Sequence, residues 1–96
     1  MQIGKMYLIK ERLWFVYSSL NEAINSEGWG STYTQNPNVN HTSLVLTPKT
    51  TIIPLTLEHE YKQNIDGIKV YKVLTGIGVT GYIKVVDAFR TGFKKV

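Results

Sequence analysis

The stretch Tyr71–Val86, YKVLTGIGVTGYIKVV, decides the fold of this chain. Two runs rich in β-branched and aromatic residues, which favour strands, flank a centre rich in glycine. Glycine adopts positive φ angles at little cost, so Gly76–Gly78 predicts the turn of a hairpin. Gly81, just inside the second run, predicts a bulge or a position where another strand passes closely. The stretch therefore predicts a β-hairpin that shapes a strand-rich domain.

The same glycines match the spacing of a dinucleotide-binding loop, Gly-x-Gly-x-x-Gly. Such a loop needs a helix that opens on the third glycine and an acidic residue about 20 positions further on. The residues after Gly81 are β-branched, and only fifteen of them remain. Without a helix N-terminus to stabilise a pyrophosphate, the match is coincidental and no dinucleotide is expected.

Strand-like patterns recur along the rest of the chain, and helical periodicity is short. Pro54 cannot donate to a sheet ladder, which predicts an edge or a bulge there. Pro48 suits the first central position of a turn, and residues 58–67 are predicted to form a polar connection ending in an Asp66-Gly67 turn. One short helical turn is predicted at 87–90. Strands are predicted for residues 3–9, 13–17, 43–47, 51–58, 68–75, 82–86 and 93–96.

One segment carries a helix signal. Ser19, followed three residues later by Glu22, forms a possible capping box, and Gly28 offers a stop. The three apolar residues Leu20, Ala23 and Ile24 share one face of that helix. The pattern predicts one short helix after the second strand.

The segment 28–42 is polar and has no period. Fifteen such residues are long for a loop in a compact domain, which indicates a functional or a mobile segment. Trp29 and Tyr33 lie within it, where the sequence shows no core for them to join. Two interpretations stay open: these rings anchor a partner, or they fold back over the domain as a lid.

Length and composition indicate a single domain over residues 1–96. The chain has no cysteine, which excludes disulfides, thiolate zinc sites and cysteine nucleophiles. Its start lacks the layout of a secretion signal, and its apolar runs are too short to span a membrane. We therefore expect a soluble cytoplasmic protein without a membrane partner.

The net charge of +4 lies entirely in residues 49–96. Lys84, Arg90, Lys94 and Lys95 stand near the C-terminal end, with Asp87 as the acidic residue among them. A basic surface attracts phosphate or acidic protein. A modest excess of lysine also keeps small domains in solution, so the basic half is either functional or only solubilising.

The hairpin resembles the distal hairpin of SH3-like barrels, especially the bacterial type. The resemblance rests on Tyr71, Val73 and Thr75 before the turn and on Gly81-Tyr82-Ile83 after it. It implies a mainly β fold: a small SH3-like barrel of five to seven strands with one short helix after the second strand. The chain has Val70-Tyr71 where peptide-binding members have a tryptophan, and no proline follows Pro54. Recognition of proline-rich peptides is therefore not expected.

Catalytic and metal-binding patterns are absent from the sequence. His41 and His59 lie in separate polar segments, and an extended strand puts His59 on the face opposite Glu58 and Glu60. No serine lies in a nucleophile elbow. We expect neither an enzyme nor a metal or other cofactor.

Three functions remain, led by a non-catalytic protein-interaction module. A nucleic-acid-binding barrel that uses the basic half and a structural subunit that pairs through the Pro54 strand or residues 93–96 are the alternatives. The composition, rich in lysine, asparagine and isoleucine, resembles that of small tailed-phage proteins, which implies a host or virion protein as partner. The candidate binding residues are Trp29, Tyr33, Tyr61, Tyr82, Lys84 and Arg90.

If Trp29 anchors a partner, Trp29→Ala weakens partner binding and leaves the melting temperature nearly unchanged, because interface aromatics carry binding energy rather than core packing. Calorimetry with the partner and a thermal melt measure the two effects. A melting temperature lower by several degrees would instead identify Trp29 as a lid over the core.

Overall fold

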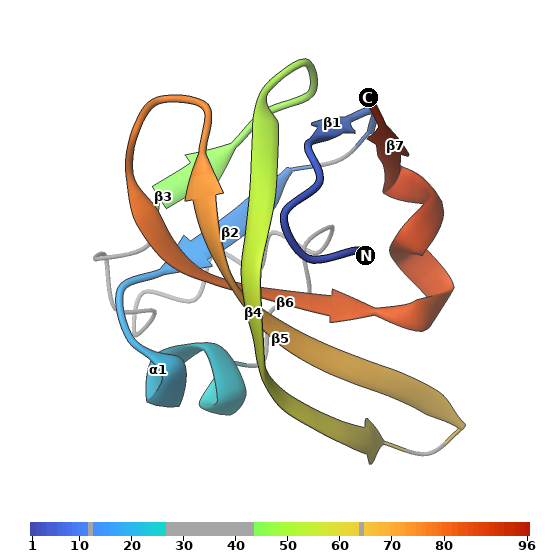
Figure 1. Cartoon of the computed structure of the whole chain (residues 1–96). Helices are drawn as coiled ribbons and strands as arrows, with labels where there is room; N and C mark the ends of the chain where they lie inside the picture. Colours follow the sequence, from blue (N-terminus) through green and yellow to red (C-terminus); the bar gives the residue numbers. More distant parts are fainter. Residues whose placement is uncertain (12, 27–43, 64) are drawn as a thin grey trace.

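The computed structural model describes residues 1–11, 13–26, 44–63 and 65–96, and it is mainly β, with 56% strand. Over these residues the chain forms one curled antiparallel sheet, a half-barrel, with one short α-helix after the second strand (Figure 1). The predicted mainly β class is therefore confirmed. The elements are β1 (Tyr7–Ile9), β2 (Trp14–Tyr17), α1 (Leu20–Asn25), β3 (Leu44–Leu46), β4 (Thr51–Gln63), β5 (Asp66–Thr75), β6 (Thr80–Val86), the 3₁₀-helix η1 (Asp87–Gly92) and β7 (Phe93–Lys95).

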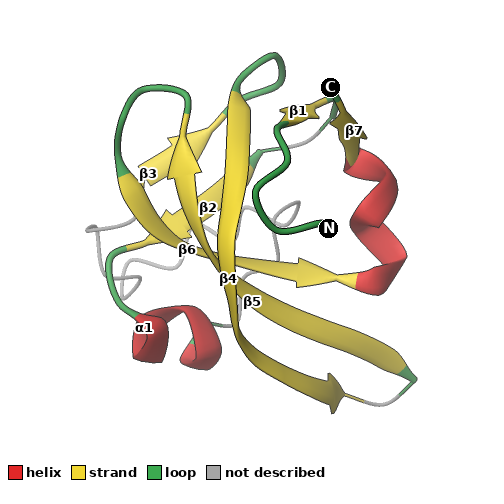
Figure 2. Cartoon of the chain, in the orientation of Figure 1, coloured by secondary structure: helices red, strands yellow, loops and turns green. Residues whose placement is uncertain are grey.

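The strands follow the order β3-β2-β6-β5-β4-β1-β7, and every pair is antiparallel. β5 occupies the centre and pairs along its length with β4 on one side and β6 on the other. β3 and β7 are the edges of the described sheet. Figure 2 shows α1 and η1 at opposite sides of the sheet in this view.

The core lies inside the curl and is built around Trp14. Trp14 lies inside the apolar run of residues 13–17, from which the sequence predicts a core position, and the structure confirms it as fully buried. Its ring lies 4.4 Å from that of Phe93, measured between centroids, and its indole N–H donates to the carbonyl of Glu11 at 3.3 Å. The ring contact joins β2 to β7 across the inside of the half-barrel, between strands that are not neighbours in the sheet. The other buried members of this cluster are Tyr7, Ile9, Val16, Leu46, Ile52, Tyr71, Val73, Ile83 and Val85.

The predicted glycine hairpin is confirmed, and its glycines serve different purposes. Gly78 has a positive φ of 85°, which the turn requires. Gly76 donates its N–H to the carbonyl of Thr51 at 2.8 Å, and a Cβ at Gly76 would lie 2.5 Å from the Thr51 hydroxyl. The Thr75 hydroxyl donates to the carbonyl of Val79 at 2.8 Å and accepts from the Val79 N–H at 3.1 Å. The turn is therefore held by β4 as well as by its own residues.

The prediction of a polar connection over residues 58–67 is wrong. β4 continues to Gln63, and β5 already begins at Asp66, opposite Gln63. Gly67 lies within β5, where a Cβ would come within 3.1 Å of the Asp87 carboxyl carbon. The glycine at that position therefore accommodates Asp87 rather than a turn. A strand that is exposed on both faces has polar composition, and the sequence pattern does not distinguish it from a loop.

Other sequence predictions are confirmed with shifted bounds. The bulge at the Pro54 strand is present, as a register shift between Pro54 and Thr56. The Ser19 hydroxyl caps α1 by accepting from the Glu22 N–H at 3.2 Å, although the helix ends at Asn25, before the predicted stop. The first strand begins at Tyr7 rather than Ile3.

Gly81 is predicted to be the least replaceable glycine of the hairpin. An added Cβ would lie 2.8 Å from the Tyr17 carbonyl and would overlap the Val16 side chain, so β2 would have to move. We expect Gly81→Ala to lower the free energy of unfolding by about 1–3 kcal/mol, as overpacking does. Urea denaturation of Gly81→Ala and of Gly78→Asn, which suits positive φ, compares the two positions. Equal stability of Gly81→Ala and the wild type would contradict the close approach.

Candidate functional site

In the part of the chain that the structure describes, α1 covers one half of the outer face of the sheet, and no helix covers the other half. α1 covers the first half: Ala23 is fully buried against Tyr17 of β2 and Val70 of β5. Phe15, Leu20, Ile24 and Tyr82 pack around them as partly buried neighbours. Burial raises the pKa of Tyr17 above its usual value, and a hydrogen bond with the Ser26 side chain opposes that effect. This half of the outer face is a second, smaller core.

The half that no described helix covers has an apolar row that runs across β5 and β4 to the residues next to β1 and β7. Met6 lies beside Val96, whose N–H donates to the Met6 carbonyl at 3.0 Å. The β1–β4 register, with Tyr7 opposite Ile52, continues to Met6 opposite Ile53, and Ile53 pairs with Leu74. The neighbours of these residues along the strands, such as Tyr7, Ile52 and Val73, point into the core, so the row faces outward. We call Val96, Met6, Ile53 and Leu74 the outer row.

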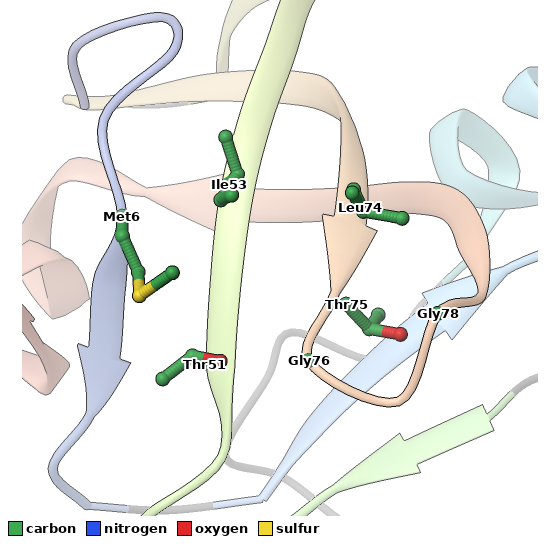
Figure 3. Close-up of a pocket in the computed structure, with 7 residues that line it drawn as sticks. All are labelled: Met6, Thr51, Ile53, Leu74, Thr75, Gly76 and Gly78. Atoms are coloured by element: carbon green, nitrogen blue, oxygen red, sulfur yellow. The ribbon is translucent and has the colours of Figure 1, made fainter.

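The outer row borders a hollow of about 280 Å³. Figure 3 shows residues that line it: Met6 just before β1, Thr51 and Ile53 of β4, and Leu74 of β5 with the glycine turn that follows that strand. No ionisable side chain is among the residues that line it, which are Met6, Thr51, Ile53, Leu74, Thr75, Gly76 and Gly78. The hollow has the lining that suits an apolar side chain, and it offers no acid, base or nucleophile stronger than a threonine hydroxyl.

Exposure distinguishes the outer row from an ordinary sheet surface. Met6 is 41% exposed and Val96 is 76% exposed, while Ile53 and Leu74 are half-buried. Ile77 and Val79 of the adjoining turn are 62% and 45% exposed. An antiparallel sheet with one solvated face normally alternates apolar inside and polar outside. At the outer row the outer face is apolar as well, so these four residues depart from that alternation.

The sequence-predicted site residues fall into three separate places. Tyr61, Tyr82 and Lys84 lie on the half of the outer face that α1 covers, with the Lys84 ammonium 5.9 Å from the centre of the Tyr61 ring. Arg90 is exposed on η1. Trp29 and Tyr33 lie outside the described residues. The structure therefore brings Tyr61 and Lys84 together and places Arg90 elsewhere.

Lys84 is an internal residue rather than a surface cation. It is 4% exposed, and its ammonium donates to the carbonyl of Ser26 at 2.7 Å. Ser26 is the C-cap of α1, and its hydroxyl donates to the Ala23 carbonyl at 2.8 Å. A cation at a helix C-terminus satisfies carbonyls that have no partner within the helix. Lys84 therefore ties the end of α1 to β6.

The sequence pattern of a single strand does not identify the outer row, because its four residues come from four separate segments of the chain. The sequence shows that Met6 and Leu8 alternate with Tyr7 and Ile9, so both faces of the first strand are apolar. That pattern was a usable signal. Whether the second apolar face of β1 is buried or exposed depends on which strands flank β1 and on where α1 packs. The alternation within one strand determines neither.

We expect Lys84→Met to lower the free energy of unfolding by about 1–3 kcal/mol, because it leaves the Ser26 carbonyl without its charged donor. Lys72→Met, on the same face of the sheet but less buried, is the matched control and is expected to change stability by less than about 0.5 kcal/mol. Chemical denaturation measures both variants. A Lys84→Met chain of wild-type stability would contradict the structural role of Lys84.

Several classes of site are missing from the part of the chain that the structure describes. No group of three or more histidine, cysteine or carboxylate side chains there could hold a metal ion. None of the helices described is long and apolar enough to cross a membrane. Comparisons with protein-family models, with curated proteins and with solved structures find no match. The function is therefore inferred from the surfaces of the chain itself.

Proposed function

We propose that this chain is a non-catalytic protein-interaction module that binds its partner through the outer row. The observation that carries the proposal is the apolar row Val96–Met6–Ile53–Leu74, which is exposed beside a hollow on a sheet face that no described helix covers. Contiguous exposed apolar surface marks interaction sites in soluble domains. A partner side chain that fills the hollow gains burial of its apolar surface at about 25 cal/mol per Å².

Rigidity of the row supports the same proposal. Ile53 and Leu74 stand on long paired strands, and the glycine turn beside them is fixed by the hydrogen bonds of Thr75 and Gly76. A surface that is already ordered costs little conformational entropy when it binds. Thus the outer row has the order that a specific interface needs. Trp29 and Tyr33 remain predicted contributors from the segment that the structure does not describe.

The second candidate function is binding of nucleic acid, and the distribution of charge favours it. The end of the sheet formed by β1 with its flanking residues, β7, η1 and the β3–β4 turn has a net charge of +4. Its six cations are Lys5, Lys10, Lys49, Arg90, Lys94 and Lys95, and its two carboxylates are Glu11 and Asp87. The remaining charges of the described residues cancel. However, Tyr7 and Phe93 at this end are each 8% exposed, so their rings offer no stacking platform for bases. A steep fall of affinity with salt would identify this function.

The proposed function predicts that Met6→Asp abolishes partner capture. The change puts a charge into the outer row at a position that is already 41% exposed, so the fold should tolerate it. Immobilised wild type and variant are compared for proteins retained from a nuclease-treated host lysate, read by mass spectrometry. We expect retention of the specific partner to fall by at least about tenfold, as for an interface hot spot.

Ile65→Asp is the matched control, because Ile65 is 95% exposed at the tip of the β4–β5 hairpin and lies outside the outer row. It is expected to retain the partner as the wild type does. The proposed function would be contradicted if Met6→Asp still retained the partner. It would also be contradicted if nuclease treatment removed the partner from the wild type.

A further inference from the structure

The open edge of β7 lies directly beside the outer row. β7 pairs with β1 on one side and is the last strand of the described sheet on the other. Lys10 donates its N–H to the Gly92 carbonyl at 2.8 Å, and Val96 donates its N–H to the Met6 carbonyl at 3.0 Å. Residues 92, 94 and 96 therefore direct their backbone groups toward β1, and Phe93 and Lys95 direct theirs away from it.

Three backbone groups at this edge are available to an incoming strand. The Phe93 N–H donates to the Arg90 carbonyl, which closes η1. The Phe93 carbonyl and both backbone groups of Lys95 have no strand partner among the described residues. These groups match one strand of about four residues, the basis of strand addition.

The side chains of β7 specify what that strand carries. On the inner face lie Phe93 and Lys95, and on the outer face lie Lys94 and the outer-row residue Val96. Residues directly opposite each other in neighbouring strands interact, so apolar residues suit Phe93 and Val96, and carboxylates suit Lys94 and Lys95. The complementary strand is apolar-acidic-acidic-apolar, which is the same in either direction.

We propose that the partner supplies an extended segment with the pattern apolar-acidic-acidic-apolar, which adds to the open edge of β7. The inference rests on the proposed function and names the chemistry of its partner. The added strand places one apolar side chain beside Val96 and so extends the outer row onto the partner. Its carboxylates meet the end of the molecule that has a net charge of +4.

The same charges argue against a second copy of this chain as the occupant. Two β7 edges that approach each other bring Lys94 and Lys95 against Lys94 and Lys95, and like charges directly opposite are destabilising. The lysines therefore block self-pairing and favour an acidic strand.

The probe is the capped hexapeptide Thr-Val-Glu-Glu-Val-Thr, titrated into the ¹⁵N-labelled full chain. Amide shifts are expected to change in β7 and β1, with slower hydrogen exchange of the Lys95 N–H. The permuted peptide Thr-Glu-Val-Val-Glu-Thr has the same composition and is expected to bind about tenfold more weakly, because each residue then faces the wrong partner. Methylation of the peptide nitrogen that faces Lys95 is expected to abolish binding, because the methyl group removes a ladder hydrogen bond.

The variant K94E/K95E reverses the charge of the β7 edge and so tests whether the charge of the bound peptide reverses with it. It is expected to lose the acidic peptide and to bind Thr-Val-Lys-Lys-Val-Thr instead, and that gain also shows that the variant is folded. Equal binding of the acidic and permuted peptides, shifts confined to other strands, or no binding at millimolar peptide would overturn the inference. Loss of the captured partner in Met6→Asp with no peptide binding would leave the proposed function standing while the strand-addition inference fails.

Discussion

The close approach of β2 to β6 at Gly81 is the constraint on which the rest of the structure depends. The Tyr17 carbonyl lies where only a residue without a Cβ leaves room for it. The approach sets the pairs Val16–Ile83 and Tyr17–Tyr82. Val16 then joins Trp14 in the inner core, and Tyr17 faces outward beneath α1. The absence of a Cβ at Gly81 therefore allows the pairing that places Val16 in the inner core and Tyr17 beneath α1.

The helix α1 covers only part of the outer face of the curled sheet. α1 has six residues, too few to be stable alone, and it is held by Ala23 in the second core and by Lys84 at its last carbonyls. A helix of that length cannot cover seven strands. Among the described residues, no helix covers the outer face from Leu74 to Val96, and the outer row lies there. A lysine that looked like part of a basic surface serves instead to anchor the helix.

Charge and apolar surface meet at one end of the molecule. The β1–β7 end has the whole net charge of the described residues, and the outer row begins at the same edge. Lysines on an edge strand repel an identical edge, so self-pairing at β7 is disfavoured. The proposed interface combines electrostatic attraction, which speeds encounter, with apolar burial, which slows dissociation.

The sequence by itself determined the mainly β class, the glycine hairpin, the cap of α1, the Pro54 bulge and the burial of Trp14. Each follows from a local rule: a backbone angle that only glycine adopts easily, a missing N–H, or an apolar run too dense to face water. It also showed that residues 6–9 are apolar on both faces. Trp29 and Tyr33 remain predictions that lie outside the described residues.

The tertiary structure alone decided which strands are neighbours and what covers each face. The sequence pattern did not predict the extension of β4 through Glu58–Gln63, because these residues are polar. Pairing with β5 stabilises them as a strand, and their composition does not show that pairing. The outer row is assembled from Met6, Ile53, Leu74 and Val96, which are separated by up to 90 positions. Lys84 is internal because its ammonium donates to the carbonyl of Ser26, a residue 58 positions away in the chain. Local periodicity shows whether a side chain is apolar or charged. Only the packing of distant segments determines whether that side chain contacts water, a helix or a partner.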